Sequence, residues 1–412
     1  MNACGLVVEY NPFHNGHVYH IRQAKKKSQA DCIIAVMSGS FLQRGEPAIV
    51  DKFHRTKAAL ASGIDLVLEL PYPFSVQSSQ WFATGAVQTL HEIGVKTICF
   101  GSESGSVTDF LTSYHLLTEK RSLYKDSLKY FLTKGLSFPE ANQYAYYKIG
   151  LTDDTLDLSQ PNNILGLSYV QAIIENNYQI EPLTIKRLKN NYHDSIITDS
   201  IASATSIRKQ LLRSHNIGDV IDTLPSAMAE QLQTYKSQTN TWHTWDQYFD
   251  ILHHRVMTMD VNELRTIHGV DEGIEYRIKK TAKQATSFRD WMKLIKTKRY
   301  TWNRIQRMFV HLLTNTKKAE IARIHKAKTV PYVRLLGMTK TGQAYLNQHK
   351  KQLNVPLVSS LSRTMDPMMA MEERSTYAYY SICPREVRST LYQQELQLPI
   401  IMPDGKRNNS VP

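Results

Sequence analysis

The sequence His14-Asn15-Gly16-His17 places two imidazoles and a glycine between an apolar run, Leu6-Val7-Val8, and a helix-like stretch over residues 18–27. Gly16 lets backbone approach a phosphate closely. The helix start supplies unpaired N–H groups and partial positive charge, and His14 and His17 add ring donors. Such a site stabilises charge on a triphosphate whose α-phosphorus is attacked, without a covalent nucleophile. Short motifs of this kind also arise by chance in loops, but the position between the first strand and first helix favours nucleotide binding.

A zinc site is the alternative use of these histidines. His14, His17 and His20 are three residues apart and could share one face of a helix. However, Asn11-Pro12 predicts a turn up to His14 rather than a helix. No cysteine or carboxylate pair with ligand spacing lies nearby. We therefore predict no metal ligands in this motif.

A second phosphate-binding element is predicted at residues 203–208, where Ser203, Thr205 and Arg208 lie at the start of a helix. Hydroxyl and N–H groups at a helix start can hold β- and γ-phosphate oxygens, and Arg208 offers a forked cation one turn later. Taken alone, the segment is better explained as an ordinary Ser/Thr N-cap. Its combination with the histidine motif favours a triphosphate site.

Short apolar strands alternate with amphipathic helices in the first hundred residues. Strands are expected at residues 6–8, 32–36, 66–70 and 97–100, with helices at about 18–27, 52–62 and 79–93. This alternation predicts an α/β fold with a doubly wound, Rossmann-like parallel sheet. Ligands of such sheets bind beyond the carboxyl ends of the strands.

Three further residues are predicted at that edge of the sheet. Gly101 follows the fourth strand and would allow close backbone contact with a base or ribose, although a simple turn explains it as well. Pro161 opens a helix in which one of the two following asparagines can act as the cap, which leaves the other, with Asn162 as the candidate, for a ligand. A strand at residues 182–185 ends in Lys186-Arg187, so Arg187 is a candidate contact to phosphate or base.

The whole chain has a formal net charge of +13. The positive charge is concentrated in its second half. Residues 1–250 hold 22 Lys and Arg against 24 Asp and Glu, whereas residues 251–412 hold 28 against 13. Residues 276–350 alone hold 19 cations opposed only by Asp290 and Glu320, interleaved with aromatic residues. A surplus of this size indicates nucleic acid rather than a single nucleotide. A merely solubilising basic helical bundle is the alternative.

A helix is expected over residues 291–313, with Lys296, Arg299, Asn303 and Arg307 on one face. Further cations extend this surface, so that the predicted RNA-contacting residues are Lys296, Lys298, Arg299, Arg304, Arg307, Lys317 and Lys318. These would be phosphate contacts, which do not select bases.

The chain is predicted to comprise a catalytic domain at 1–215 with a helical insertion at about 108–160, connecting helices at 216–250, a basic helical domain at 251–400 and a mobile tail at 401–412. Residues 331–337 look like a buried helix turn or a core packing segment. The apolar content of 42%, the absence of a long apolar run or a leading signal sequence, and four cysteines without CxxC spacing predict a soluble, cytoplasmic protein with reduced thiols and no membrane association.

Four blocks in matching order resemble the bacterial tRNA(Met) cytidine acetate ligases, within the HIGH-type nucleotidyltransferase superfamily. They are GLVVEYNPFHNGH at residues 5–17, MSGSFLQRGEP at 37–47, PNNILG at 161–166 and KTKRYT at 296–301. The superfamily's late motif usually reads Ile-Ser-Ser-Thr-x-Ile-Arg. Here Ala202 and Ala204 occupy its first and third positions, which leaves open which hydroxyls besides Ser203 and Thr205 contact phosphate.

The resemblance implies a two-step reaction. ATP and acetate would give acetyl-adenylate and pyrophosphate, and the acetyl group would pass to N4 of the wobble cytidine of elongator tRNA(Met). It implies that His14 and His17 are catalytic and that Mg²⁺ accompanies the ATP phosphates. It also implies ATP contacts from Val7, Val8, Glu9, Tyr10, Asn11, Pro12, Phe13, His14, Asn15, Gly16, His17, Val18, Tyr19, His20, Gly101, Asn162 and Arg187.

Two other function classes share parts of the pattern. A nucleotidyltransferase of cofactor biosynthesis would share the first half, but it would not explain the basic second half. A non-enzymatic RNA-binding protein would leave both phosphate elements without a role. The acetate pocket, the selection of one tRNA and the oligomeric state stay open.

Overall fold

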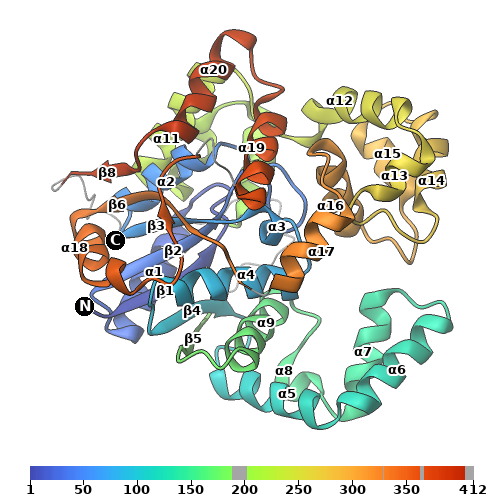
Figure 1. Cartoon of the computed structure of the whole chain (residues 1–412), viewed down its shortest axis with the longest axis horizontal. Coiled ribbons are helices and arrows are strands. Elements are labelled where there is room, and N and C mark those ends of the chain that lie inside the picture. The colour runs from blue at the N-terminus through green and yellow to red at the C-terminus, as the bar shows by residue number, and fades with distance from the viewer. Residues whose placement is uncertain (188–201, 328, 362–365, 404–412) are drawn as a thin grey trace.

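The computed structural model describes residues 1–187, 202–327, 329–361 and 366–403. One sheet lies at its centre, with strand order β5-β4-β1-β2-β3-β6-β7 and β8 paired to β6 (Figure 1). Its strands are β1 (Ala3–Val8), β2 (Cys32–Ser38), β3 (Leu66–Leu70), β4 (Thr97–Ser102), β5 (Glu181–Lys186), β6 (Val333–Thr339), β7 (Leu357–Val358) and β8 (Ile400–Met402).

Helices occupy most of the remaining described chain. Those in the first half are α1 (Asn15–Ser28), α2 (Lys52–Ala61), α3 (Tyr72–Ser75), α4 (Ser79–Glu92), α5 (Val107–Glu119), α6 (Arg121–Thr133), α7 (Phe138–Ile149), α8 (Asp153–Leu156) and α9 (Pro161–Glu175). Next come α10 (Ala204–Ser214), the 3-10 helix η1 (Ile217–Thr223), α11 (Ser226–Thr239), α12 (Trp245–Thr258), α13 (Val261–Thr266), α14 (Ile274–Ala282), α15 (Phe288–Ile295), α16 (Trp302–Leu313) and α17 (Lys318–Ala327). The last are α18 (Lys340–His349), η2 (Lys350–Gln352), α19 (Pro367–Tyr380), α20 (Arg385–Gln393) and η3 (Gln394–Leu396). Among the described residues, no helix is both long and apolar enough to cross a membrane.

The first five strands confirm the predicted doubly wound sheet. They pair in parallel in the order β3-β2-β1-β4-β5. Every residue of β2 and β3 is buried, which explains why these strands read as apolar runs rather than alternating patterns. The strand order reverses between β1 and β4, and a crevice beyond the carboxyl ends of such a pair is where ligands bind in this class of sheet.

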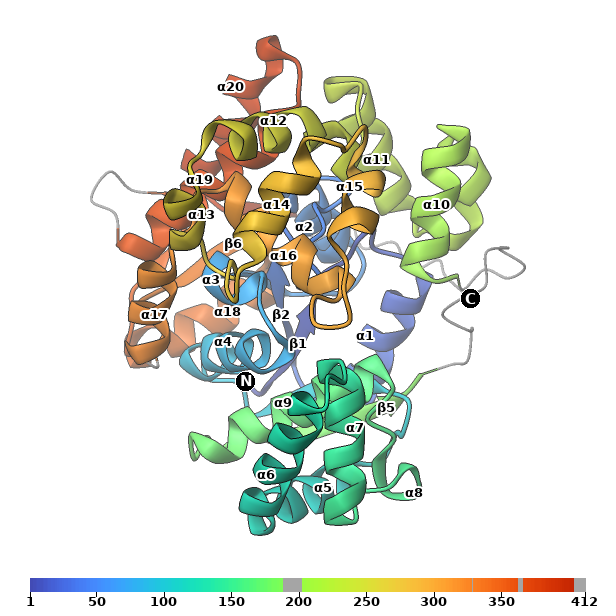
Figure 2. The same cartoon turned by 90° about the vertical axis from the view of Figure 1, so that its right-hand side faces the viewer.

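Two groups of helices lie away from the sheet. Helices α5 to α8 lie between β4 and α9, over the residues for which an insertion was expected, and α12 to α17 form a helical region from the second half of the chain. Both groups project toward the right of Figure 1, and Figure 2 shows them from that side, with α12–α16 above α5–α8.

The C-terminal part returns to the sheet, so the mainly helical region expected over 251–400 also contains strands. Residues 331–337 are not a helix turn, because Val333–Thr339 form β6, which pairs antiparallel with β3. Ile401 and Met402 belong to β8 rather than to the mobile tail predicted at 401–412, and residues 404–412 of that prediction lie outside the described part of the chain. A short buried apolar run does not distinguish a strand from a helix, which is why the sequence misled here.

Buried ion pairs fix the returning segment to the sheet. Lys52 Nζ lies 2.6 Å from Glu69 Oε1 and 2.8 Å from Glu395 Oε1. Arg334, on β6, lies 2.9 Å from Glu69 Oε2 and also pairs with Glu395. All four side chains are at most 2% exposed, so each cation needs both carboxylates for compensation. Burial and the neighbouring charge of Glu69 raise the pKa of Glu372, beside this cluster, to about 8.

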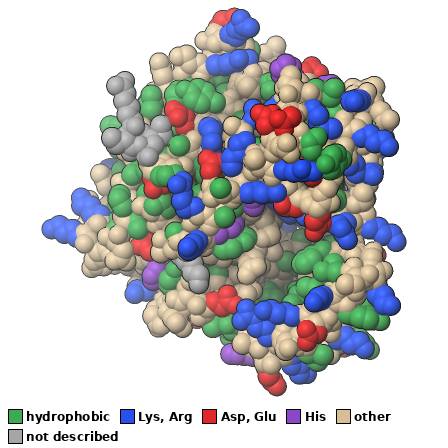
Figure 3. All heavy atoms as spheres, turned by 45° about the vertical axis from the view of Figure 1, so that its right-hand side comes forward, with side chains coloured by type: hydrophobic (Ala, Val, Ile, Leu, Met, Phe, Trp, Pro, Cys, Tyr) green, Lys and Arg blue, Asp and Glu red, His purple; other side chains and the backbone are tan. Residues whose placement is uncertain are grey.

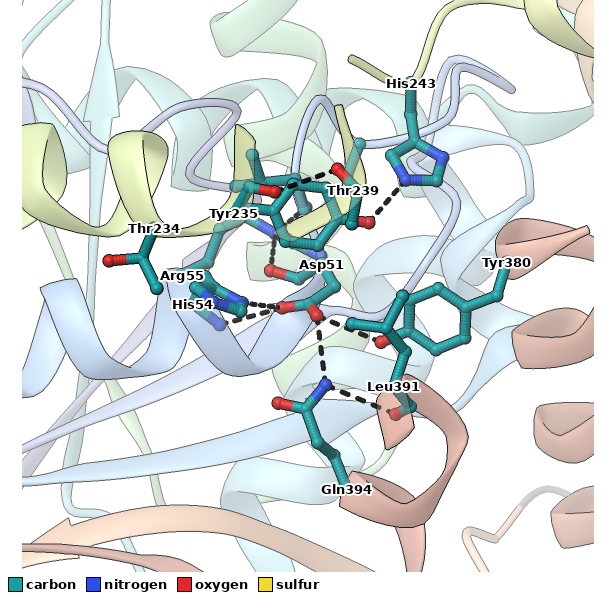
Figure 4. A network of polar contacts seen from close by, with 12 residues as sticks. Asp51, His54, Arg55, Thr234, Tyr235, Thr239, His243, Tyr380, Leu391 and Gln394 are labelled. Carbon is teal, nitrogen blue, oxygen red and sulfur yellow. Dashed lines mark hydrogen bonds and ion pairs between the residues drawn. The ribbon is translucent and has the colours of Figure 1, made fainter. Parts of the chain in front are cut away.

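A second buried polar network joins α2 to the C-terminal helices (Figure 4). Asp51 caps α2 by accepting a hydrogen bond from the His54 N–H at 2.8 Å, and it also contacts His54 Nδ1 at 2.7 Å. The Tyr380 hydroxyl and Gln394 Nε2 also donate to this carboxylate, at 3.0 and 3.3 Å. Burial alone would raise the pKa of Asp51, but the charge and hydrogen bonds of His54 hold it below its usual value.

Candidate functional site

The two histidines of the first motif form the N-terminus of α1. His14 is the N-cap residue, and its Nδ1 accepts a hydrogen bond from the Gly16 N–H at 3.1 Å. His17 reciprocates, because its Nδ1 accepts the His14 N–H at 3.1 Å. The two rings lie 3.7 Å apart between centroids. This is a capping box built from imidazoles, so the same side chains shape the helix start and face the strand-order reversal.

These contacts determine the protonation pattern of both rings. A backbone N–H can only donate, so each Nδ1 is an acceptor and a neutral ring must carry its proton on Nε2. Burial, followed by the charges of Arg187 and Arg208, lowers the pKa of His14 to about 3. Burial and the neighbouring His14 also hold the pKa of His17 well below its usual value. At neutral pH the pair therefore offers two Nε2–H donors without positive charge.

His20 lies one turn further along α1. Its Nε2 is buried and has no hydrogen-bond partner among the described residues. Burial and the charge of Arg187 lower its pKa to about 4. Because Arg187 influences the pKa of all three histidines, its guanidinium lies near the start of α1.

The carboxyl ends of β4 and β5 bring three predicted residues together. A Cβ on Gly101 would lie 3.5 Å from Cγ of Arg187, so these residues are neighbours. Asn162 donates from Nδ2 to Glu103 Oε1 at 2.6 Å, and its Oδ1 accepts from Arg187 at 3.5 Å. Asn163 serves the fold, since its Oδ1 accepts the N–H groups of Glu103 and Ser104. The predicted capping role is wrong for both asparagines, because Gln160 is the N-cap residue of α9 and no side chain caps this helix; a ligand contact from Asn162 stays a prediction.

The second phosphate element also lies near the first. Ser203 is the N-cap of α10 and accepts the Ser206 N–H at 3.1 Å, which is the ordinary capping role. Arg208 donates to the Asn11 carbonyl at 2.7 Å and pairs with Glu46 at 3.2 Å. Its guanidinium therefore links the loop after β1 to the loop after β2. Thr205 is partly exposed at the same helix start.

The segment from Val7 to His20 contains two kinds of residue. Tyr10 and Phe13 are buried core side chains, and Asn11 accepts the Ile49 N–H at 2.7 Å, so these residues hold the loop in shape. Partly exposed side chains of the segment are those of Val7, Glu9, Asn15, His17, Tyr19 and His20. Apart from His14, which is 8% exposed, any contact from the buried residues to a nucleotide would come from their backbone.

Arg55 was missed by the sequence analysis. Its buried guanidinium donates to the carbonyls of Glu9 and Ser38, at 2.7 and 3.0 Å, and to that of Gly39. These carbonyls follow β1 and β2, so Arg55 joins two loops at the site edge. Nothing in the spacing of charged residues along α2 distinguishes it from a surface arginine.

The predicted RNA-contacting cations are arranged differently from the expectation. The expected helix over 291–313 is two helices, α15 and α16, joined by residues 296–301. Lys296, Lys298 and Arg299 therefore lie exposed on a loop rather than on one helical face with Arg307. We call residues 296–301 the cationic loop.

Arg299, which lies 3.9 Å from Glu272, and the other four cations have partners within the fold. Arg304 packs 4.3 Å from the ring centroid of Tyr300, Lys317 donates to Thr266 at 3.0 Å, and Lys318 lies 2.7 Å from Asp271. Arg307 donates to the Gln43 carbonyl at 3.4 Å, and burial lowers its pKa to about 10. Arg307 thus joins α16 to the 41–47 loop, in addition to any contact with RNA.

Residues 1–395 match the family described as HIGH Nucleotidyl Transferase. The chain is 56% identical to a tRNA(Met) cytidine acetate ligase of Oceanobacillus iheyensis over 98% of this chain and 100% of that protein. The chain belongs to this family of ligases. The chain is also 44% identical to the tRNA(Met) cytidine acetate ligase of Bacillus subtilis, over 96% of both chains.

Solved structures of the family agree with the fold. The apo crystal structure of Thermotoga maritima TmcAL superposes with a TM-score of 0.90 at 32% identity, covering 98% of this chain and 100% of that one. A second crystal form, bound with alpha-thio ATP, has a TM-score of 0.88 at 32% identity and the same coverage. The names of these relatives describe ligases that act on tRNA(Met), and one of the Thermotoga maritima structures holds alpha-thio ATP.

Proposed function

We propose that this protein joins acetate to ATP as acetyl-adenylate and transfers the acetyl group to N4 of the wobble cytidine of elongator tRNA(Met). The observation that carries the proposal is the His14–His17 pair at the strand-order reversal, in a chain that matches tRNA(Met) cytidine acetate ligases along nearly its whole length. The alpha-thio ATP bound to the Thermotoga maritima relative supports a nucleotide in the first step.

In the first step, an acetate oxygen attacks the α-phosphorus and the bond to the bridging oxygen of pyrophosphate breaks. Acetate is ionised at neutral pH, so no general base is needed. The Nε2–H donors of His14 and His17 hold the α-phosphate oxygens as negative charge builds there. Arg187, with Ser203, Thr205 and Arg208 at the start of α10, stabilises the departing pyrophosphate. Positioning of this kind can supply up to ~7–11 kcal/mol of the barrier.

Mg²⁺ would arrive with ATP. Among the described residues, no cluster of three or more His, Cys, Asp or Glu side chains has the arrangement of a metal site. Phosphate oxygens and water would therefore hold the ion, and its chemistry would be charge neutralisation on the triphosphate. A cytoplasmic location follows from the proposed tRNA substrate.

In the second step, the N4 amine of cytidine attacks the acetyl carbonyl, AMP leaves and the amine loses a proton. The protein has to bring the base to the adenylate and exclude water, which would hydrolyse the mixed anhydride. The cationic loop supplies phosphate contacts for the RNA.

Exchange of labelled pyrophosphate into ATP tests the first step separately. We expect exchange that depends on acetate and falls sharply with longer carboxylates such as butyrate. Exchange that depends on a small phosphate ester, and that acetate does not support, would instead indicate a nucleotidyltransferase of another pathway.

A further inference from the structure

The hairpin formed by α6 and α7 is unusually apolar on its surface. Six large apolar side chains of the hairpin and the residues flanking its turn are more than a third exposed: Leu123, Tyr130, Leu132, Phe138, Tyr144 and Tyr147. No residue of α6 is buried. Exposed apolar side chains concentrated on one short hairpin make it a candidate interaction site.

Two of these aromatic residues share one face of α7. Glu140, Tyr144 and Tyr147 are spaced by four and three positions, which places them on the same side of a helix. Tyr147 is 72% exposed and Tyr144 is 53% exposed. The buried residues Ala141, Ala145 and Ile149 define a different face of α7.

The start of α7 lies near the cationic loop, and Tyr147 projects from the same side of this helix as Glu140, whereas the Tyr144 ring also stacks on Phe131 of α6 at 5.0 Å. Hydrogen bonds from Ser137 lower the pKa of Glu140, and the charge of Lys298 lowers it further, so Lys298 lies within electrostatic reach of α7. Figures 1 and 2 both show the loop between α15 and α16 extending toward α7. The surface is hollowed between these two regions, and Figure 3 shows hydrophobic and Lys or Arg side chains along the lower rim of the hollow.

Both sides of this cleft are positively charged. The hairpin carries Arg121, Lys125, Lys129, Lys134 and Lys148, all exposed, against Asp126 and Glu140. The cationic loop adds Lys296, Lys298 and Arg299, of which Arg299 lies 3.9 Å from Glu272. Exposed aromatic rings within a cationic groove are the combination that binds unpaired nucleotides, because rings stack on bases while cations contact phosphates.

We propose that Tyr144 and Tyr147 form a stacking platform for unpaired bases of the RNA substrate, which is held between α7 and the cationic loop. The proposal rests on the proposed function for the identity of the RNA, but it assigns to the insertion a role of its own. A protein partner, such as a second copy of this chain, would need apolar surface without the surplus of cations on both sides.

Substitutions at Tyr147 test the platform with little effect on folding, because this side chain is largely exposed. Tyr147→Ala should weaken binding of full-length elongator tRNA(Met) by roughly fivefold to a hundredfold, as expected for loss of one base–aromatic stack. Tyr147→Phe should bind like the wild type. Tyr377→Ala is a matched control, since Tyr377 is 56% exposed on α19, where it stacks on Tyr392 at 4.5 Å.

Two further readouts separate stacking from other roles. The dependence of affinity on salt should keep the same slope in Tyr147→Ala, because no phosphate contact is lost, and a fully base-paired RNA should show no effect of the substitution. Wild-type tRNA affinity in Tyr147→Ala, or a concentration-dependent dimer that this variant disrupts, would overturn the platform. Failure of the proposed function would appear differently, as absence of acetate-dependent pyrophosphate exchange in the wild type.

Discussion

The backbone N–H of His14 donates to Nδ1 of His17, while Nδ1 of His14 accepts the N–H of Gly16. This reciprocal arrangement gives the two rings a structural and a chemical role at once. It caps α1, and it leaves Nε2–H as the remaining donor of each neutral ring. Substitutions at these positions therefore need variants that separate capping from catalysis.

Replacement of His14 by asparagine should make this separation. Asparagine is among the best N-cap residues, so α1 should keep its start, but the Nε2–H donor is lost. We expect acetate-dependent pyrophosphate exchange to fall about a hundredfold or more, because well-placed donors to a developing charge contribute on that scale. His14→Ala should lose the same activity and also about 1 kcal/mol of stability. Near-normal exchange in folded His14→Asn would remove the ring from the mechanism.

The same reasoning applies to His17, whose Nε2–H has no capping function. His17→Gln, which keeps an acceptor for the His14 N–H at N3 of the capping box but lacks the Nε2–H donor, should lower exchange on the same scale, as measured by initial rates at saturating ATP. Circular dichroism of the variant, compared with the wild type, controls for unfolding.

The low pKa values of these histidines predict a flat pH profile for the first step. His14 and His20 have pKa values of about 3 and about 4, so both rings stay neutral from pH 6 to pH 8. Because the folded pKa lies below the unfolded value of about 6.5, their contribution to stability is complete above pH 6.5 and is lost as the pH falls toward the folded pKa. A rate inflection near pH 6.5 that disappears in His14→Asn would contradict the neutral pair.

The sequence predicted the nucleotide-binding half well, because its determinants are local. Buried parallel strands appear as apolar runs, and a glycine with two histidines at a helix start is visible within four residues. The strand β6 was not predicted, since its pairing with β3 joins positions more than 260 residues apart and its Arg334 has its charge compensated only by distant carboxylates. The break at 296–301 had a local signal that was overlooked, namely Thr301 as N-cap before Trp302.

The site was predicted to a similar extent. The sequence indicated which residues gather at the strand ends, but it could not indicate hydrogen-bond directions, such as Arg208 donating to the Asn11 carbonyl. Those depend on side-chain conformations set by the whole fold.

Charge reversal in the cationic loop should weaken RNA binding selectively. Lys296→Glu, Lys298→Glu and Arg299→Glu together should lower tRNA affinity and flatten its salt dependence, whose slope is roughly 0.7 to 0.9 per phosphate contact, whereas ATP affinity should not change. Reversal of Lys350, Lys351 and Arg385, which are exposed on η2 and α20, alters the net charge equally and serves as the control. Equal losses in both triple variants would indicate a general charge effect rather than a loop contact.

Stability should depend strongly on the buried ion cluster. Arg334→Met leaves Glu69 and Glu395 with only Lys52 as a cation, and removal of one member of a buried pair typically costs about 3–5 kcal/mol. Urea denaturation should show this loss in the free energy of unfolding. Arg289→Met, at an exposed position on α15, should change it by less than about 0.5 kcal/mol.

Nucleoside analysis of tRNA after incubation with labelled acetate and ATP tests the central claim most directly. The predicted result is label in N4-acetylcytidine from elongator tRNA(Met), dependent on ATP, accompanied by one AMP per acetyl group and absent with His14→Asn. Label that stays in acetyl-adenylate or free acetate in the presence of folded tRNA, or that appears on a different nucleoside, would contradict it.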